Sequence, residues 1–492
     1  MKEMSELLKL RREKLDEFAK EGINPFPNDF KVTHNSQEIR ERFSKMEAND
    51  LEKVEEEFSL AGRVMAIRNF GKAAFFHIQD RKGKIQAYIQ KNVVGNNYFK
   101  IFKELDIGDF LGIRGGIFLT RTQELTIKVN EIRLLTKSLR PLPEKWHGLS
   151  NIEIRYRQRY LDILVNPEAK EIFYRRTKII QTIRTFFQDR EFMEVETPML
   201  QSIPGGAAAL PFKTHHNTFN LDLYLRISPE LYLKRLLVGG FERVFEINRN
   251  FRNEGISTQH NPEFTMLEFY QAYATYEDLM DLTEEMICHT AQQLLGSLKA
   301  PYGDKEIDFT PPWQRLSMKQ AIINYGKLEP QMLEKKELAF KKAEAIGLSP
   351  SPQDGLGKIV NDLFDEMAQP HLIRPTFITS YPTETSPLAR RSDTNPEEVD
   401  RFELFINGQE IANAFSELND PIDQKARFLK QLSSKESTED IGKLDEDFIQ
   451  ALEYGMPPAA GEGIGIDRLV MLLTNSSSIR DVILFPLLKP ER

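Results

Sequence analysis

The residues best suited to chemistry gather in short segments of the carboxyl-terminal two thirds of the chain. Period-two alternation puts four polar residues on one face of a first strand: Glu246, Asn248, Asn250 and Arg252. A second strand presents a carboxylate among apolar and aromatic neighbours: Phe264, Met266, Glu268 and Tyr270. Because a buried ionised group is costly unless it is paired, we expect this second face to bind a charged ligand. A structural ion pair between Arg252 and Glu268 is the alternative.

A second group of acidic residues follows from a hairpin signal. Asn407-Gly408 predicts a two-residue loop that pairs Phe405 with Glu410. Glu403 is then a diagonal neighbour of Glu410, with Cα atoms about 7 to 8 Å apart. Two glutamates so placed could hold one hard cation, and Mg²⁺ with a phosphate ligand is the natural candidate. The alternative is a pair of exposed glutamates on a solvated sheet face.

Two further polar residues of the same strand create a conflict with strict alternation. Asn413 and Glu417 fall on the opposite face from Glu410. All of them, with Glu403, can line one pocket only if a bulge interrupts the strand. We therefore predict a bulge at residues 412–414.

The segment PPAAGEGIGIDRLVMLL combines a glycine-rich approach with an amphipathic helix that begins near Arg468. Backbone N–H groups at a helix start, together with a cation, favour an anionic ligand. The glycines could equally serve helix packing.

A basic segment precedes these motifs and has the composition of a small β-barrel. Residues 60–137 carry 14 Lys and Arg against 6 Asp and Glu, a local net charge of +8 in a chain of net charge −8. Five short β-branched and aromatic runs fit a barrel of the kind that binds single-stranded nucleic acid, because bases stack on aromatic side chains. Phe75, Phe76 and Tyr88 are the candidate aromatic residues, unless they are ordinary core residues.

The remaining sequence predicts how the chain is organised. Its 492 residues suggest roughly three units. We expect a helical segment at 1–57, a barrel at 58–140 and a linker at 141–165. A third unit follows at 166–492, beginning with a helix capped by Asn166. Its long strands lack regular βα alternation, which predicts an α+β fold with an antiparallel sheet flanked by helices and a helical insertion at about 314–374.

Composition also excludes several classes of protein. The single cysteine, Cys288, permits no intrachain disulfide, and the eight histidines are scattered, so a zinc site is not expected. The chain begins with a charged segment rather than a signal peptide and contains no long apolar run. We therefore expect a cytoplasmic protein with no membrane partner.

Taken together, these segments resemble class II aminoacyl-tRNA synthetases, and the lysyl-tRNA synthetase family in particular, along nearly the whole chain. The segment FMEVETPML resembles the first motif of the class, a helix and a strand ending in Pro198 that form the homodimer interface. FRNEG with HNPEF resembles the second motif, and GEGIGIDRLV the third. The resemblance implies an OB-fold anticodon-binding domain followed by a catalytic domain. The implied activity is ATP-dependent charging of lysine tRNA through a lysyl-adenylate.

The resemblance also implies an ATP site. Arg252 is expected to hold the α-phosphate and the substrate carboxylate, and Arg468 to neutralise the γ-phosphate. Glu403 and Glu410 are expected to bind Mg²⁺. Adenine and the neighbouring ATP groups are expected to contact three residues: Glu254, His260 and Phe264.

For the amino acid, the resemblance implies a pocket selective for lysine. Glu230 is expected to face the α-amino group, and Glu268 and Glu417 the ε-ammonium. Beside them are expected three further residues: Tyr270, Asn413 and the Gly206 backbone. Aspartyl- and asparaginyl-tRNA synthetases share the barrel and the motifs, but an aspartate pocket needs a cation where this chain presents glutamates.

In the barrel, the resemblance assigns reading of a U-rich anticodon to four residues: Arg68, Phe75, Gln86 and Glu124. The chain departs from the family pattern at Leu210, where a basic residue is usual, and at Glu462, where an apolar residue is common. Two other kinds of protein remain as rivals. One is a catalytically idle RNA-binding protein, and the other is a synthetase-like enzyme that adenylates an amino acid without tRNA.

Overall fold

Alternating hydrophobic residues close five amino-terminal strands into a barrel. The computed structural model describes residues 6–143, 149–207, 209–433 and 444–491, and it divides into two compact units, Met1–Gly148 and Leu149–Arg492. The barrel strands are paired in the order β1-β2-β3-β5-β4. Their bounds are β1 Phe58–Asn69, β2 Ala73–Gln79, β3 Lys84–Gln90, β4 Phe110–Leu119 and β5 Leu125–Thr136. The predicted five-stranded barrel is confirmed, and a helix between β3 and β4, α4 (Lys91–Lys103), is an addition.

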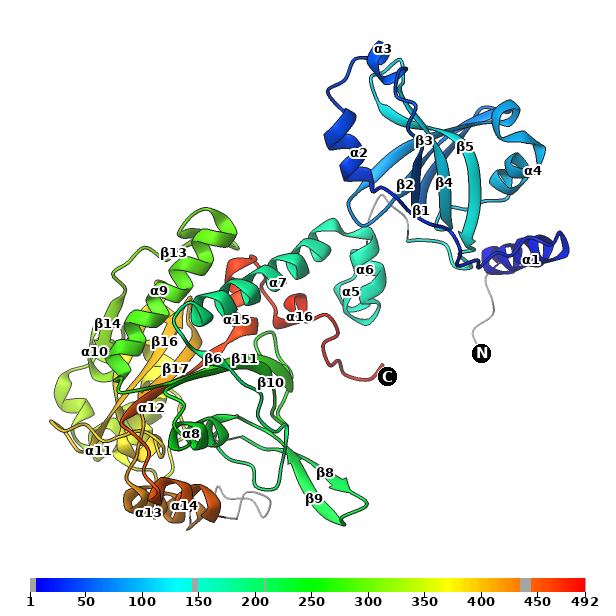
Figure 1. Ribbon diagram of the computed structural model, residues 1–492. Helices are drawn as coiled ribbons and strands as arrows, with labels where there is room; N and C mark the ends of the chain where they lie inside the picture. Colours follow the sequence, from blue (N-terminus) through cyan, green and yellow to red (C-terminus); the bar gives the residue numbers. More distant parts are fainter. Residues whose placement is uncertain (1–5, 144–148, 208, 434–443, 492) are drawn as a thin grey trace. The chain divides into compact units, whose positions relative to one another are not determined.

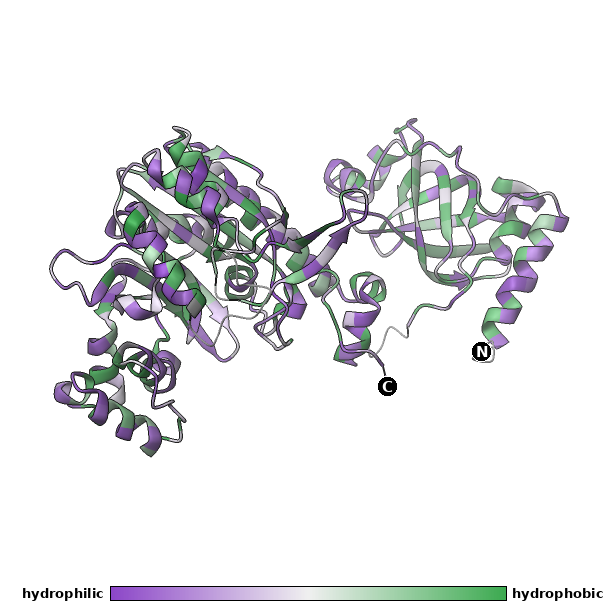
Figure 2. Ribbon diagram, turned by 90° about the horizontal axis from the view of Figure 1, so that it is seen from below, coloured by the Kyte–Doolittle hydropathy of each residue, from purple (hydrophilic) through white to green (hydrophobic). Residues whose placement is uncertain are grey.

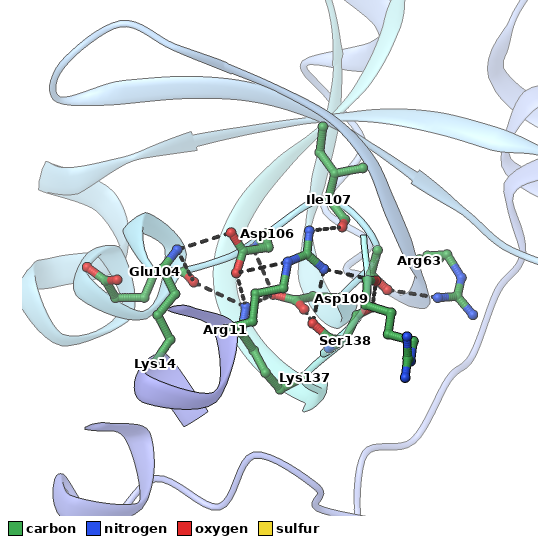
Figure 3. A network of polar contacts seen from close by, with 11 residues as sticks. Arg11, Lys14, Arg63, Glu104, Asp106, Ile107, Asp109, Lys137 and Ser138 are labelled. Atoms are coloured by element: carbon green, nitrogen blue, oxygen red, sulfur yellow. Dashed lines mark hydrogen bonds and ion pairs between the residues drawn. The ribbon is translucent and has the colours of Figure 1, made fainter. Parts of the chain in front are cut away.

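A buried network of charged groups holds the first helix against the end of the barrel (Figure 3). In α1 (Glu6–Lys20), the Arg11 guanidinium donates to the backbone carbonyls of Ile107, Ser138 and Arg140. Lys137, at the end of β5, is fully buried, and its Nζ lies 2.8 Å from Asp109 Oδ2. Burying charge is tolerated because each group is paired. The expected helical segment also contains α2 (Ser36–Phe43) and α3 (Ala48–Leu51).

The second unit is built on an eight-stranded sheet (Figure 1). Its order is β14 (Gln314–Ser317), β15 (Thr376–Pro382), β16 (Glu398–Ile406), β17 (Gln409–Ser416), β18 (Ala459–Gly465), β11 (Glu263–Ala272), β10 (Arg243–Phe251) and β6 (Met193–Glu194). The central pairs are antiparallel, but β14 pairs with β15, and β6 with β10, in parallel. The expected antiparallel sheet is therefore a mixed sheet, because long connections lead into both outer pairs and permit parallel pairing.

One face of this sheet is closed by helices and the other is left open for a site. Helices α7 (Pro167–Gln188), α9 (Tyr276–Leu295) and α15 (Ile466–Leu473) cover the closed face. There Phe187 stacks on Phe245, with ring centroids 5.3 Å apart, and contacts Phe269 at 4.7 Å. Figure 2 shows hydrophobic and hydrophilic residues mixed along the helices of the structure, as expected of helices with one buried face. The open face carries α8 (Glu230–Val238), α13 (Pro421–Ser433) and α14 (Glu446–Glu453).

The structure differs from the sequence expectations at two segments. The expected insertion begins with β14, a strand of the main sheet, and its helical part comprises α10 (Met318–Gly326), η1 (Pro330–Leu333), α11 (Lys336–Ala345), α12 (Leu356–Met367) and η2 (Gln369–His371). The expected linker contains two helices, α5 (Ile152–Arg157) and α6 (Arg159–Val165). Asn166 precedes α7 as expected, but its side chain donates to Asp162 instead of capping the helix.

The other elements are short. A three-stranded sheet consists of β7 (Leu200–Gln201), β8 (Phe212–His216) and β9 (Leu221–Leu225). A hairpin, β12 (Lys299–Tyr302) with β13 (Lys305–Asp308), follows α9, and η3 (Thr383–Thr385) and α16 (Ile479–Val482) complete the list. Across the described residues, none of the helices has the length and apolar character needed to cross a membrane.

Candidate active site

The open face of the large sheet holds a cavity of about 840 Å³. Strands β11, β17 and β18 form its floor, and α8, α13 and the loop after β10 form its walls. The four residues that alternation placed on one face of β11 all line it: Phe264, Met266, Glu268 and Tyr270. The polar segments that are far apart in sequence therefore meet at one place.

A bulge in β17 turns the predicted acidic residues toward this cavity. Phe405 pairs with Glu410, as the hairpin signal predicts, but Leu404 pairs with Ala412, so Ile411 has no partner in β16. The register shift allows both Glu410 and Asn413 to line the cavity. The predicted bulge is present, although it lies at Ile411, just before residues 412–414.

Glycines in β18 leave room for the side chains on the cavity floor. A Cβ atom on Gly461 would lie 2.2 Å from Tyr270 Cε1 and 2.4 Å from Glu417 Oε1. A Cβ on Gly463 would lie 2.9 Å from Met266 Cε. The glycine-rich segment thus forms a strand beneath the cavity, and its glycines admit the larger residues of β11 and β17.

Glu462, between these glycines, faces away from the cavity floor toward α9. Its carboxyl oxygens lie 2.6 and 2.8 Å from the hydroxyl of Thr283, which donates to them. Burial raises the pKa of Glu462 well above its usual value. Burial therefore favours the protonated form of Glu462, the residue at which the sequence departs from the expected apolar type.

Three buried carboxylates cluster at one end of the cavity, where Glu230 and Glu268 line it and Glu417 lies beside Tyr270 at Gly461. Glu230 is 6%, Glu268 5% and Glu417 1% exposed. Glu268 accepts a hydrogen bond from the Ser228 hydroxyl at 2.9 Å and lies 3.4 Å from the Tyr270 hydroxyl. Burial, reinforced by the charge of Glu230, raises the pKa of Glu268 to about 8. Such a group is strongly stabilised by a cationic ligand.

The alternative interpretation of Glu268, a structural ion pair with Arg252, does not hold. Glu268 stands opposite Glu246 in the β10–β11 ladder, several positions from Arg252. Glu246 itself is paired with Arg226 at 2.9 Å. Among the residues that the structure describes, no cation lies within ion-pair distance of Glu268.

Gly206 brings the backbone close to the same carboxylates. Its φ of 85° lies in the left-handed region that favours glycine. A Cβ at this position would lie 3.0 Å from both Glu230 Cβ and Ser228 Oγ. The residue type is therefore required both by the backbone conformation and by the close approach to Glu230.

The opposite end of the cavity is cationic. The Arg252 guanidinium lies over the Phe264 ring, 5.2 Å from its centroid. Arg468, in α15, donates from Nη2 to His260 Nε2 at 3.1 Å and from Nη1 to the Glu410 carbonyl at 2.6 Å. Burial and the charge of Arg468 lower the pKa of His260, so the ring is neutral and accepts this hydrogen bond. The two arginines create a site for a polyanion, and Glu254 lines the same end.

Glu403 and Glu410 also line the cavity, and Glu410 Oε2 lies 3.6 Å from Arg468 Nη1 at the cationic end. Glu403 accepts hydrogen bonds from Tyr381 and Arg401, and its side chain is 16% exposed against 42% for Glu410. Burial, opposed by Arg401 and reinforced by Glu410, raises the pKa of Glu403 to about 7. The alternative of two solvated glutamates therefore fails for Glu403. Two hard oxygen donors that destabilise each other's charge fit a divalent cation shared with phosphate oxygens.

In the first unit, the four predicted anticodon residues lie on one outer face of the barrel. Arg68 pairs with Phe75 across β1 and β2, and Phe75 pairs with Tyr88 across β2 and β3. Two residues further along β2, His77 pairs with Gln86. Glu124 lies 3.3 Å from His77 Nε2. The Phe75 and Tyr88 rings are 4.5 Å apart. Phe76, by contrast, is 1% exposed and belongs to the barrel core, so it is not available for stacking.

Comparison with known proteins matches each unit to a family of its own. Residues 151–489 match the family described as tRNA synthetases class II (D, K and N), and residues 58–135 match the OB-fold nucleic acid binding domain. The chain belongs to the class II tRNA synthetases.

Individual relatives of this class II synthetase cover nearly its whole length. The lysine–tRNA ligase of Pelotomaculum thermopropionicum is 57% identical over 491 residues, which are 99% of this chain and 96% of the relative. That of Carboxydothermus hydrogenoformans is 54% identical over 489 residues, 99% of each chain. That of Salmonella paratyphi B is 55% identical over 487 residues, 98% of this chain and 96% of the relative.

Several residues at the site of this class II synthetase were not predicted from its sequence. Ser228 orients Glu268, and Lys234 pairs with two of the carboxylates. Arg401 donates to both Asn413 and Glu403, which are paired across β16 and β17. Lys234 could have been found, because it follows Glu230 by four residues on one helix. Leu210 lines the cavity, and its carbonyl accepts from the Asn253 backbone at 2.7 Å, a contact that does not depend on side-chain type.

Proposed function

We propose that this class II synthetase is a lysine–tRNA ligase. It activates L-lysine with ATP to form lysyl-adenylate and pyrophosphate, and then transfers lysine to the 3′ end of lysine tRNA. Three neighbouring buried carboxylates carry the proposal, Glu230 and Glu268, which line the cavity, and Glu417 beside them. The names of the relatives support the same substrate.

The first step needs no general base. An oxygen of the lysine carboxylate forms a bond to the α-phosphorus of ATP, and the bond from that phosphorus to the bridging oxygen breaks. Pyrophosphate leaves with the electron pair. Arg252 holds the attacking carboxylate and the α-phosphate together, and Arg468 neutralises charge at the γ-phosphate. Positioning and charge stabilisation of this kind lower the barrier without proton transfer.

The other ATP contacts come from the same end of the cavity. Phe264 stacks on adenine, with Arg252 already over one side of its ring. Glu254 and the neutral His260 bind the adenine and adjacent ATP groups. Glu403 and Glu410 would hold Mg²⁺, which when bound would neutralise charge on the phosphates.

Lysine specificity follows from charge. Glu230 binds the α-ammonium beside the Gly206 backbone. Glu268 and Glu417 bind the ε-ammonium. Tyr270 and Asn413 complete the pocket, which rejects an uncharged side chain because the buried carboxylates would then remain unpaired. Aspartate is rejected more strongly, since its carboxylate would face Glu268 directly.

The outer face of the barrel binds the anticodon. Phe75 stacks on a base, while Arg68, Gln86 and Glu124 contact base edges of a U-rich sequence. Pairing of these residues across neighbouring strands supports the assignment, because bases read by one protein face must lie side by side.

The enzyme acts as a homodimer in the cytoplasm. Near Pro198, three large apolar side chains are between 44% and 50% exposed: Met193, Met199 and Leu200. Exposed apolar groups so close together are typical of a protein interface. Analytical ultracentrifugation tests the dimer, and a monomer at micromolar concentration would contradict it.

The function is tested by charging total tRNA with each of the twenty amino acids in turn. Lysine alone should be transferred in an ATP- and Mg²⁺-dependent reaction. Adenylate formation without any charging would favour an enzyme that acts without tRNA. Binding of tRNA without either reaction would favour an idle RNA-binding protein.

A further inference from the structure

A lysine of the protein itself lies behind the wall of the proposed lysine pocket, in contact with two of its carboxylates. Lys234 is in α8, one turn after Glu230, and its side chain is fully buried. Its Nζ lies 2.7 Å from Glu230 Oε1 and 2.5 Å from Glu417 Oε2. The Phe415 ring, 5.3 Å away, closes the other side. This ammonium group thus bridges two of the three carboxylates.

The contacts of Lys234 keep it charged. Burial alone lowers the pKa of an ammonium group, but the charges of Glu230 and Glu417 outweigh burial and raise the pKa of Lys234. Burial also raises the pKa of Glu417, and Lys234 opposes that rise. In the described part of the chain, Lys234 is the one cation within ion-pair distance of Glu417. Glu268 has no such partner.

The charges of the filled pocket balance for a substrate with two ammonium groups. When all three carboxylates are ionised, the one resident ammonium leaves two negative charges without a cation. L-Lysine brings two ammonium groups, and its carboxylate goes to Arg252 at the other end of the cavity. The three carboxylates of the filled pocket then face three ammonium groups. A substrate with one ammonium leaves a buried carboxylate unpaired, which is strongly unfavourable.

We propose that Lys234 is a specificity-determining positioning residue, a resident counter-cation that sets the charge of the pocket to match a substrate with two ammonium groups. This inference rests on the proposed lysine substrate. Lys234 contacts neither reacting atom, and it acts through Glu230 and Glu417. A purely structural role, anchoring α8 to β17, would use the same ion pairs but would make no demand on the number of charges.

The charge-matching and structural roles predict opposite changes in the lysine KM when Lys234→Met is added to Glu417→Gln. Glu417→Gln leaves two carboxylates facing three ammonium groups, so the lysine KM in ATP–pyrophosphate exchange should rise at least tenfold. Adding Lys234→Met to that variant restores equal numbers of opposite charges. The lysine KM of the double variant should therefore be at least threefold lower than that of Glu417→Gln, with the ATP KM unchanged within twofold in both.

Controls keep the comparison interpretable. Lys358→Met removes another lysine that pairs with an acidic residue four positions away, Asp362, but on the partly exposed α12. It should leave the lysine KM at the wild-type value. The key comparison uses Glu417→Gln and the double variant, so it stands even if Lys234→Met alone does not fold.

Each outcome decides a separate question. A double variant with a lysine KM equal to or higher than that of Glu417→Gln overturns the charge-matching role. Failure of the double variant to fold while Glu417→Gln folds also overturns it, because α8 would then need Lys234 as an anchor. Absence of lysine-dependent exchange in the wild-type enzyme instead contradicts the proposed function itself.

Discussion

Lysine binding should depend steeply on pH because Glu268 is buried without a cationic partner. At a pKa of about 8, roughly one Glu268 in a hundred is ionised at pH 6 and roughly one in ten at pH 7. The ε-ammonium of lysine pairs with the ionised form, so it lowers the pKa of Glu268 in the complex. Binding below pH 8 must then release a proton.

The magnitude follows from the fraction of Glu268 that is ionised. Raising the pH from 6 to 8 increases that fraction about 50-fold, so the Kd for lysine should fall by a similar factor. The lysine ε-amino group, with a pKa of about 10.4, stays charged over this range.

Isothermal titration calorimetry provides the assay. At pH 7, titrations of lysine in buffers of different ionisation enthalpy should reveal release of close to one proton. Burial also raises the pKa of Glu417 to about 8, so Glu268→Gln removes one of two titrating carboxylates. The lysine affinity of this variant should be weaker and less dependent on pH between 6 and 8. A wild-type affinity that is independent of pH, or a Glu268→Gln variant that keeps the full pH dependence, would refute the reasoning.

Three further predictions concern other parts of the molecule. Gly461→Ala places a Cβ 2.2 Å from Tyr270, so the lysine KM should rise at least tenfold in ATP–pyrophosphate exchange while the ATP KM changes little. Phe75→Ala removes the ring on which a base stacks, a contact worth about 1 to 3 kcal/mol. Charging of tRNA should therefore weaken while ATP–pyrophosphate exchange is retained, and equal loss of both activities would mean that Phe75 supports the fold. Lys137→Met leaves Asp109 buried without its ammonium partner, which should destabilise the barrel by about 3 to 5 kcal/mol. Hydrogen exchange in the barrel strands measures this loss, and unchanged protection would contradict it.

The strands and the faces of the site could be predicted because their pattern is local. The Asn407-Gly408 hairpin set the pairing of Phe405 with Glu410, and alternation put Glu268 and Tyr270 on one face of β11. The conflict between Glu410 and Asn413 even required a bulge. Its position at Ile411 could not be predicted, because any residue of the short segment can absorb the extra length.

Other features depend on contacts between segments that are distant in sequence. At the outer ends of the sheet, β14 pairs in parallel with β15, and β6 with β10. This pairing follows from long connections, which the alternation of residues along a strand does not reveal. Phe75 and Phe76 are neighbours in sequence, and only the closed barrel shows that Phe76 is core. The glycine pattern of β18 was ambiguous for the same reason. The role of these glycines depends on Tyr270, in β11, and on Glu417, which follows β17.

The central claim is that three buried carboxylates select a dicationic amino acid for adenylation. ATP–pyrophosphate exchange measures this step directly, with lysine compared against aspartate, asparagine and norleucine, the last of which matches the length of lysine but lacks its ε-ammonium. Lysine should support exchange at micromolar to millimolar concentration, and the other three should give rates at the level of the reaction without amino acid. Exchange supported equally by norleucine, or by aspartate or asparagine in preference to lysine, would contradict the account.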